Sequence, residues 1–203
     1  MDEKLSEKTY QEIKTYALSR MARLKDANHN NKHVVRVKNN ALKIIKLLSI
    51  EKEVDENLLK AICLLHDFSY TIRKPSLYTY IFEGHIERRI IRLILEKFDL
   101  SKKVKEIIVD AVFRHTHSFP FRRLNKGHSV YAKILQDADT LDFFNCLRIK
   151  IYISEHDKGI FKSLRKYLSS KLIQYGINNL GSFLNYPILS KSFFLGSSAK
   201  CAE

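Results

Sequence analysis

Histidine and aspartate stand side by side at the end of an apolar run, Leu59 to Asp67, which reads L-K-A-I-C-L-L-H-D. A His and an Asp at the inner end of a buried helix are costly unless something pairs with them, and a divalent metal would satisfy both. The dipeptide alone is weak evidence, because the chain has a second such pair, His156-Asp157, in a polar stretch. The first pair therefore has to be judged by whether other residues complete a coordination shell.

Further residues of metal-ligand type fall at the ends of apolar helical stripes elsewhere in the chain. A single histidine at a helix end is more often a capped residue than a ligand, and an aspartate in a helix usually faces solvent. Mixed His and carboxylate ligation suits Mn²⁺, Fe²⁺, Ni²⁺, Co²⁺, Zn²⁺ or Mg²⁺, with positions left open for water and substrate. The set comprises His33, His66, Asp67, His85, His115 and one of Asp137 and Asp139.

The elements that would position these residues are helices, because apolar residues recur at helical spacing and no sustained β alternation is visible. We therefore expect an all-α fold. Ser101 is the expected N-cap of a helix that ends at His115. The other expected helices cover residues 5–25, 33–49, a run ending at His66, a run from Glu83 with Ile86, Ile90, Leu93 and Ile94 inward, 128–147, and a basic amphipathic helix over 160–175.

The length of 203 residues suits one core with an appendage. We expect a helical metal-binding domain over residues 1–150 and a C-terminal helical extension over 151–203 packed on it. Residues 183–195 could pack back on the core or form a homodimer contact. Three cysteines without a C-x-x-C pair argue against a disulfide framework or a cysteine-rich zinc site and fit a reducing cytoplasm. No secretory signal and no membrane-spanning run is visible.

The net charge of +14 attracts anions in general. Nucleotides, nucleic acid and acidic membrane surfaces all qualify, and the charge selects none of them. A lysine-rich solvated surface explains it equally well.

Several of these motifs, taken in order, resemble the HD-domain metal-dependent phosphohydrolases. The first, H-V-V-R-V-K-N-N-A at 33–41, is followed by L-L-H-D at 64–67, E-G-H at 83–85, the helix end at His115, and I-L-Q-D-A-D-T-L-D at 134–142. Their order and spacing match over roughly residues 20–148. The resemblance implies an all-α HD-domain-like bundle that hydrolyses phosphomonoesters or phosphodiesters, often of nucleotides.

The resemblance also assigns roles to residues. It implies that His33, His66, Asp67 and a late aspartate bind metal, and the family pattern A-D-x-L selects Asp139, whereas helical periodicity leaves Asp137 open. His85 and His115 stand where two-metal members of the family have extra ligands and one-metal members have phosphate-facing residues. One departure is Tyr70, which stands where many members have the lysine of H-D-x-x-K. The G-Y-P signature of the cyclic-dinucleotide branch is missing, which argues against that branch.

The chemistry that follows is metal-assisted phosphate hydrolysis, with Asp67 or the late aspartate orienting or deprotonating water and His85 and His115 as further catalytic groups. Guanidinium and ammonium groups bind phosphate, although any one of them could be plain surface charge. A basic nucleic-acid-binding protein with a non-catalytic metal, and a purely structural metal, are the alternatives. The candidate substrate-binding residues are Arg36, Arg73, Lys74, Arg122 and Arg123.

Overall fold

Helices form every regular element in the described part of the chain. The computed structural model describes residues 4–24, 28–73, 76, 78, 82–116, 126–156 and 162–194, and no strand occurs among them. This confirms the all-α class expected from the sequence. In chain order the elements are α1 (Glu7–Met21), α2 (Asn31–Leu47), α3 (Glu56–Leu65), the 3₁₀ turn η1 (Phe68–Thr71), α5 (Glu83–Leu95), α6 (Lys102–His115), α7 (Val130–Phe143), α8 (Cys146–His156), α9 (Lys162–Asn178), α10 (Leu180–Phe183) and α11 (Leu189–Phe194).

Polar cap residues set the starting points of the helices that build the site. The Asn30 side chain accepts hydrogen bonds from the backbone N–H groups of Lys32 and His33 at the start of α2. Ser101 caps α6, as the sequence predicted, and Ser129 caps α7 in the same way. Each cap satisfies backbone donors that have no partner within the helix. The caps therefore fix which helical turn carries each functional side chain.

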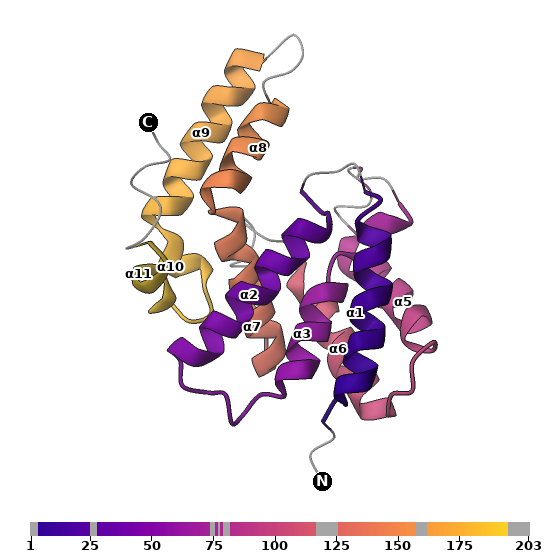
Figure 1. Ribbon diagram of the computed structural model, residues 1–203. Coiled ribbons are helices and arrows are strands. Elements are labelled where there is room, and N and C mark those ends of the chain that lie inside the picture. Colours follow the sequence, from indigo (N-terminus) through magenta and orange to yellow (C-terminus); the bar gives the residue numbers. More distant parts are fainter. Residues whose placement is uncertain are drawn as a thin grey trace.

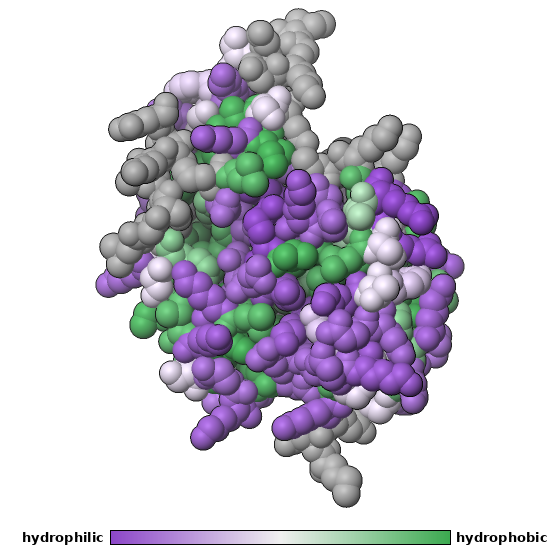
Figure 2. Space-filling model, in the orientation of Figure 1, coloured by the Kyte–Doolittle hydropathy of each residue, from purple (hydrophilic) through white to green (hydrophobic). Residues whose placement is uncertain are grey.

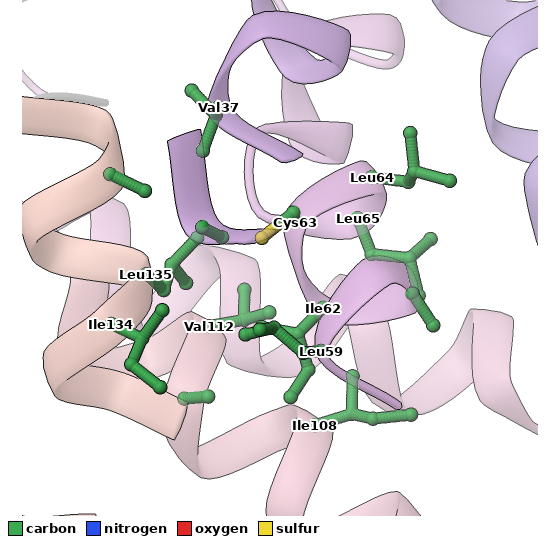
Figure 3. Packing of buried hydrophobic residues seen from close by; sticks show 14 of the residues in the cluster. Val37, Leu59, Ile62, Cys63, Leu64, Leu65, Ile108, Val112, Ile134 and Leu135 are labelled. Atoms are coloured by element: carbon green, nitrogen blue, oxygen red, sulfur yellow. The ribbon is translucent and has the colours of Figure 1, made fainter. Parts of the chain in front are cut away.

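The apolar core surrounds α3, which packs against α1, α2, α6 and α7 (Figure 1). Leu59, Ile62 and Leu65 on α3 are fully buried, and they meet side chains of α2, α6 and α7 (Figure 3). Burying each such side chain contributes about 1.5–3 kcal/mol. This packing holds the C-terminal end of α3 firmly, and that end carries His66.

The C-terminal part of the chain adds a helical hairpin, α8 and α9, which contacts the bundle through α7 and extends above it in Figure 1. After the hairpin, α10 and α11 bring the chain back to the core. Asp137 on α7 accepts hydrogen bonds from the backbone N–H groups of Asn185 and Tyr186 at 2.7 and 2.9 Å. The residues of this returning segment that join the apolar core are Leu180, Phe183, Leu184 and Leu189.

The outer face of α9 is partly apolar, with Leu164, Tyr167 and Leu168 all more than half exposed. Figure 2 shows apolar side chains on the α8–α9 hairpin against a surface that is otherwise largely hydrophilic. None of the helices in the described ranges has an apolar stretch long enough to cross a bilayer. The division of the chain at residue 150 stays a prediction, and α8 runs across that position.

Two local expectations were wrong. The inward face predicted for α5 fails at Leu93, which is 66% exposed, whereas Glu87 is fully buried. The Glu87 carboxyl group accepts the backbone N–H of Ser69 at 3.1 Å, which gives the buried group a hydrogen-bond partner, and the helix turns a different side inward. The single helix expected over 128–147 is two helices, because Asn145 accepts the backbone N–H of Leu147 and starts α8 as a separate element.

Candidate metal centre

Three histidines stand at the ends of three different helices that meet at one edge of the core. His33 lies in the first turn of α2, His66 is the C-cap of α3, and His115 is the last residue of α6. Asp67 follows directly on the α3 cap, and Asp139 lies within α7. All five side chains belong to residues with at most 9% exposure. The helix ends thus deliver polar groups to a place from which water is largely excluded.

The four predicted metal ligands converge. The Nε2 atom of His33 lies 3.2 Å from Nε2 of His66 and 3.1 Å from Oδ2 of Asp67. It is 3.6 Å from Oδ1 of Asp139. His66 Nε2 is also 3.3 Å from Asp67 Oδ2, and His115 Nε2 is 3.4 Å from Asp67 Oδ1. Residues separated by more than a hundred positions therefore share one small volume.

The opposite nitrogen of each imidazole is held by an acceptor, which fixes the orientation of the ring. Nδ1 of His66 and Nδ1 of His115 donate to backbone carbonyls three residues earlier, at 2.9 and 2.5 Å. Nδ1 of His33 faces Oδ2 of Asp142 at 2.8 Å. Because these acceptors need a proton on Nδ1, each neutral ring presents a lone pair on Nε2. Such outer hydrogen bonds are typical of histidines that bind metals.

Asp142 is a residue that the sequence did not single out as part of the site. Its carboxylate accepts hydrogen bonds from Nε and Nη2 of Arg36 at 2.6 and 3.1 Å, as well as from His33. Burial raises the pKa of Asp142, but the hydrogen bonds from His33 and Arg36 outweigh it and lower the pKa to about 2. The carboxylate is therefore ionised. One sequence signal could have identified Asp142: it is the third aspartate in the segment 136–142, which otherwise has the apolar pattern of a core helix.

The two candidate aspartates on α7 point to different sides of the helix. Asp139 lies beside His33, at the distance given above, whereas Asp137 is fully buried against the returning C-terminal segment and bonds to Asn185 and Tyr186. Positions two apart on a helix face roughly opposite ways. The geometry places Asp139, the residue favoured by the A-D-x-L pattern, beside the other predicted ligands.

The donor set calls for a cation. Three Nε2 lone pairs and the carboxylates of Asp67 and Asp139 face one another, and like dipoles and charges at such distances repel. Burial alone lowers the pKa of His66, but the charges of Asp67 and Asp139 reverse this and raise the pKa to about 9. Burial likewise raises the pKa of Asp67, but the neighbouring His66 and hydrogen bonds from the histidines lower it well below its usual range. The residues thus hold either a proton or a metal ion, and their ligand types fit a divalent metal.

A cavity of about 40 Å³ adjoins the cluster. Glu83, at the start of α5, forms part of its wall, and its carboxylate accepts a hydrogen bond from the Tyr70 hydroxyl at 2.7 Å. Gly84, the next residue, lets the start of α5 lie close against α6, because a Cβ at this position would lie only 3.0 Å from the backbone oxygen of Phe113. The described residues that line the cavity are His29, Asp67, Glu83, His115, Thr116, Asp139 and Arg148.

Of the other predicted site residues, the structure describes His85, Arg36 and Arg73. His85, expected as an extra ligand or a phosphate-facing residue, is exposed on α5 with its ring 5.4 Å from the ring of Phe113, and the α5 residue that lines the cavity is Glu83. The guanidinium of Arg36 is engaged by Asp142, behind His33. Arg73 is partly buried, and its Nε atom has no hydrogen-bond partner among the described residues. Lys74, Arg122 and Arg123 lie outside the described residues. Roles for all six stay predictions.

Comparison with known families gives one match that decides the relationship. The family model named HD domain matches residues 31–143, which is more than half of the chain. The chain belongs to the HD domain family. The matched segment contains His33, His66, Asp67, His115 and Asp139, so the whole cluster lies within the HD domain.

A solved structure has the same fold. It is the 1.45 Å crystal structure of a predicted HD superfamily hydrolase from an uncultured Thermotogales bacterium. Its TM-score is 0.54 at 19% sequence identity, and the alignment covers 85% of this chain and 90% of that one. No curated protein matches the chain. The structural match extends well beyond the HD domain itself and therefore includes part of the C-terminal region.

Proposed function

We propose that this HD domain protein is a metal-dependent phosphohydrolase that acts on small phosphate esters, with nucleotides as the foremost candidate substrates. The single observation that carries the proposal is the convergence of three imidazole nitrogens and two carboxylates beside a small polar cavity. The high positive charge of the chain suits an anionic substrate. The phosphohydrolase activity rests on the family resemblance together with this geometry.

His33, His66, Asp67 and Asp139 would hold the metal. When bound, the metal would polarise a phosphoryl oxygen and supply a nucleophilic water near neutral pH. The donor atoms form two overlapping sets, one with His33, His66 and Asp139 and one with His66, Asp67 and His115. This arrangement suits one ion or a pair of neighbouring ions, and Mn²⁺, Fe²⁺, Ni²⁺, Co²⁺, Zn²⁺ and Mg²⁺ all accept such ligands.

Side chains around the cavity would position water and transfer protons. Asp67 stays ionised because its pKa is lowered, so it can orient a water molecule and accept a hydrogen bond from it. His115, with its Nδ1 fixed on a carbonyl, can take up or deliver a proton at Nε2 on the cavity wall. Burial raises the pKa of the Tyr70 hydroxyl, so it remains a donor and holds the Glu83 carboxylate in place.

A substrate screen with matched variants tests the proposal. Nucleoside mono-, di- and triphosphates and simple phosphodiesters are offered to the full chain with each divalent metal, and released phosphate or alcohol is measured. We expect His66→Ala and Asp67→Ala to abolish hydrolysis while the helical circular dichroism signal stays. His128, which is exposed, and Asp110, whose side chain is 42% exposed, provide matched controls, His128→Ala and Asp110→Ala, which should retain activity.

The same assay separates the enzyme from a nucleic-acid-binding protein. A chelator should silence a metal-dependent hydrolase, and moderate salt should not. Binding driven by phosphate charge would instead weaken steeply with salt and ignore the chelator. Hydrolysis that survives in either ligand variant, or that ignores the chelator, would refute the proposed site.

A further inference from the structure

Arg148 brings a buried guanidinium to the cavity from outside the HD domain match. It lies in the first turn of α8, beyond residue 143 where the match ends, and it is 7% exposed. It lines the same cavity as Asp67, His115 and Asp139. A buried arginine is uncommon unless it has a specific partner. A guanidinium in this position is expected to bind an anion.

The contacts of Arg148 with described residues leave most of its donors available. Nη1 donates to the backbone oxygen of Asn28 and lies 3.9 Å from Oδ2 of Asp142. That carboxylate already accepts two closer hydrogen bonds from Arg36 and one from His33. The bond to Asn28 fixes the direction of the guanidinium, and Nε and Nη2 carry three further N–H groups that can bind a ligand.

The charges of the cavity show what such a ligand would be. Among the described residues that line it, Arg148 supplies a permanent positive charge, and Asp67, Glu83 and Asp139 supply carboxylates. A metal ion on the ligands offsets much of that negative charge, which leaves the arginine to attract a further anion. Arginine binds phosphate through two parallel N–H···O bonds.

The size of the cavity limits how much of a substrate can enter it. Pockets that enclose a whole small molecule measure about 300–1,000 Å³, whereas this cavity is about 40 Å³. The cavity is therefore too small for a whole nucleotide, and we expect it to take only the phosphoryl group that all candidate substrates share.

We propose that Arg148 binds a non-bridging oxygen of the substrate phosphate, so that α8 completes the active site of the HD domain. The inference rests on the proposed function for its substrate class. The competing explanation is structural: Arg148 would only tie α8 to the segment before α2 through Asn28.

Phosphate binding to the metal-loaded chain tests this assignment without requiring turnover. The full chain is saturated with Mn²⁺, and the affinity for inorganic phosphate is measured by calorimetry in wild type, Arg148→Gln and Arg148→Lys. Loss of a charge-assisted pair should weaken phosphate binding about 10- to 100-fold in Arg148→Gln. Arg148→Lys keeps the charge and should lose less. Arg92→Gln, at an exposed ion pair with Glu106, is the control and should bind phosphate as wild type does.

A second measurement separates ligand binding from a structural role. Arg148→Ala should regain phosphate affinity when millimolar guanidinium is added, since the free cation can occupy the vacated space, and Mn²⁺ affinity should stay within threefold of wild type. Unchanged phosphate affinity in Arg148→Gln would overturn the assignment, as would a loss that appears only together with loss of Mn²⁺. If the chain hydrolyses no ester yet binds phosphate through Arg148, the proposed function fails, and Arg148 remains a phosphate-binding residue of the cavity.

Discussion

Replacing Asp142 with asparagine tests whether the residues behind the proposed metal ligands tune the site. The Asp142 carboxylate accepts hydrogen bonds from His33 Nδ1 at 2.8 Å and from Arg36 Nε and Nη2 at 2.6 and 3.1 Å. Asparagine keeps the shape but has one acceptor oxygen in place of two. Its NH₂ group must therefore face a donor of His33 or of Arg36, and one contact becomes repulsive.

The expected magnitude follows from these contacts. Loss of an outer partner of a metal-binding histidine lowers metal affinity about 10- to 100-fold, which corresponds to about 1.4–2.8 kcal/mol. A lost hydrogen bond to a charged group costs about 1.5–3 kcal/mol of folding stability. Because Arg36 is 24% exposed and can turn towards water, we expect the lower part of that range.

Metal affinity is measured by competition with a coloured chelator, and stability by thermal unfolding with and without metal. The matched control is Asp110→Asn, because Asp110 pairs with Arg114 on the surface of α6 and has no contact with the site. The control should change stability by less than about 1 kcal/mol and leave metal affinity as it is. Equal metal affinities in Asp142→Asn, Asp110→Asn and wild type would refute the idea that Asp142 acts through His33.

Three further predictions concern stability. Burial, reinforced by the charges of Asp67 and Glu83, raises the pKa of Glu87 well above its ordinary value despite its bond from Ser69. The stability that this group contributes is present in acid and is lost as the pH rises through its raised pKa. Glu87→Gln should therefore gain in melting temperature over wild type at pH 8 but not at pH 4, and equal gains at both would contradict the assignment. Removing the metal with EDTA should lower the melting temperature by about 5–11 °C if the ion was present at a hundred times its dissociation constant, and an unshifted melting curve would count against a bound ion. Asp137→Asn should cost about 1.5–3 kcal/mol by weakening the bonds to the C-terminal segment, with metal content unchanged; loss of metal in this variant would show that Asp137 serves the site.

Local sequence signals predicted the helices well where a cap and a periodic stripe coincide. Ser101 and the stripe that follows it placed α6 and its last residue, His115, as observed. The order of the motifs also selected His66 and Asp67, which lie together in the structure. These features depend on interactions within a few residues, or on a pattern shared by the family.

The rest of the site depends on packing between distant segments. The side of α5 that turns inward is decided by Gly84 against α6 and by the bond from Ser69 to Glu87, so the sequence pointed to His85 where the structure places Glu83. Arg148 contacts Asn28, which lies 120 residues earlier in the sequence, and no local sequence pattern predicts that contact. Helical periodicity could not separate Asp137 from Asp139, because both sides of α7 are buried.

The most direct measurement is the metal content of the purified full chain, determined by elemental analysis together with Mn²⁺ titration of the chelator-treated protein. The account predicts one or two tightly held divalent ions per chain in wild type, near zero in His66→Ala and Asp139→Asn, and wild-type content in His128→Ala. A wild-type chain that binds no divalent metal, or ligand variants that bind it as tightly as wild type, would contradict the claim that these side chains form a metal centre.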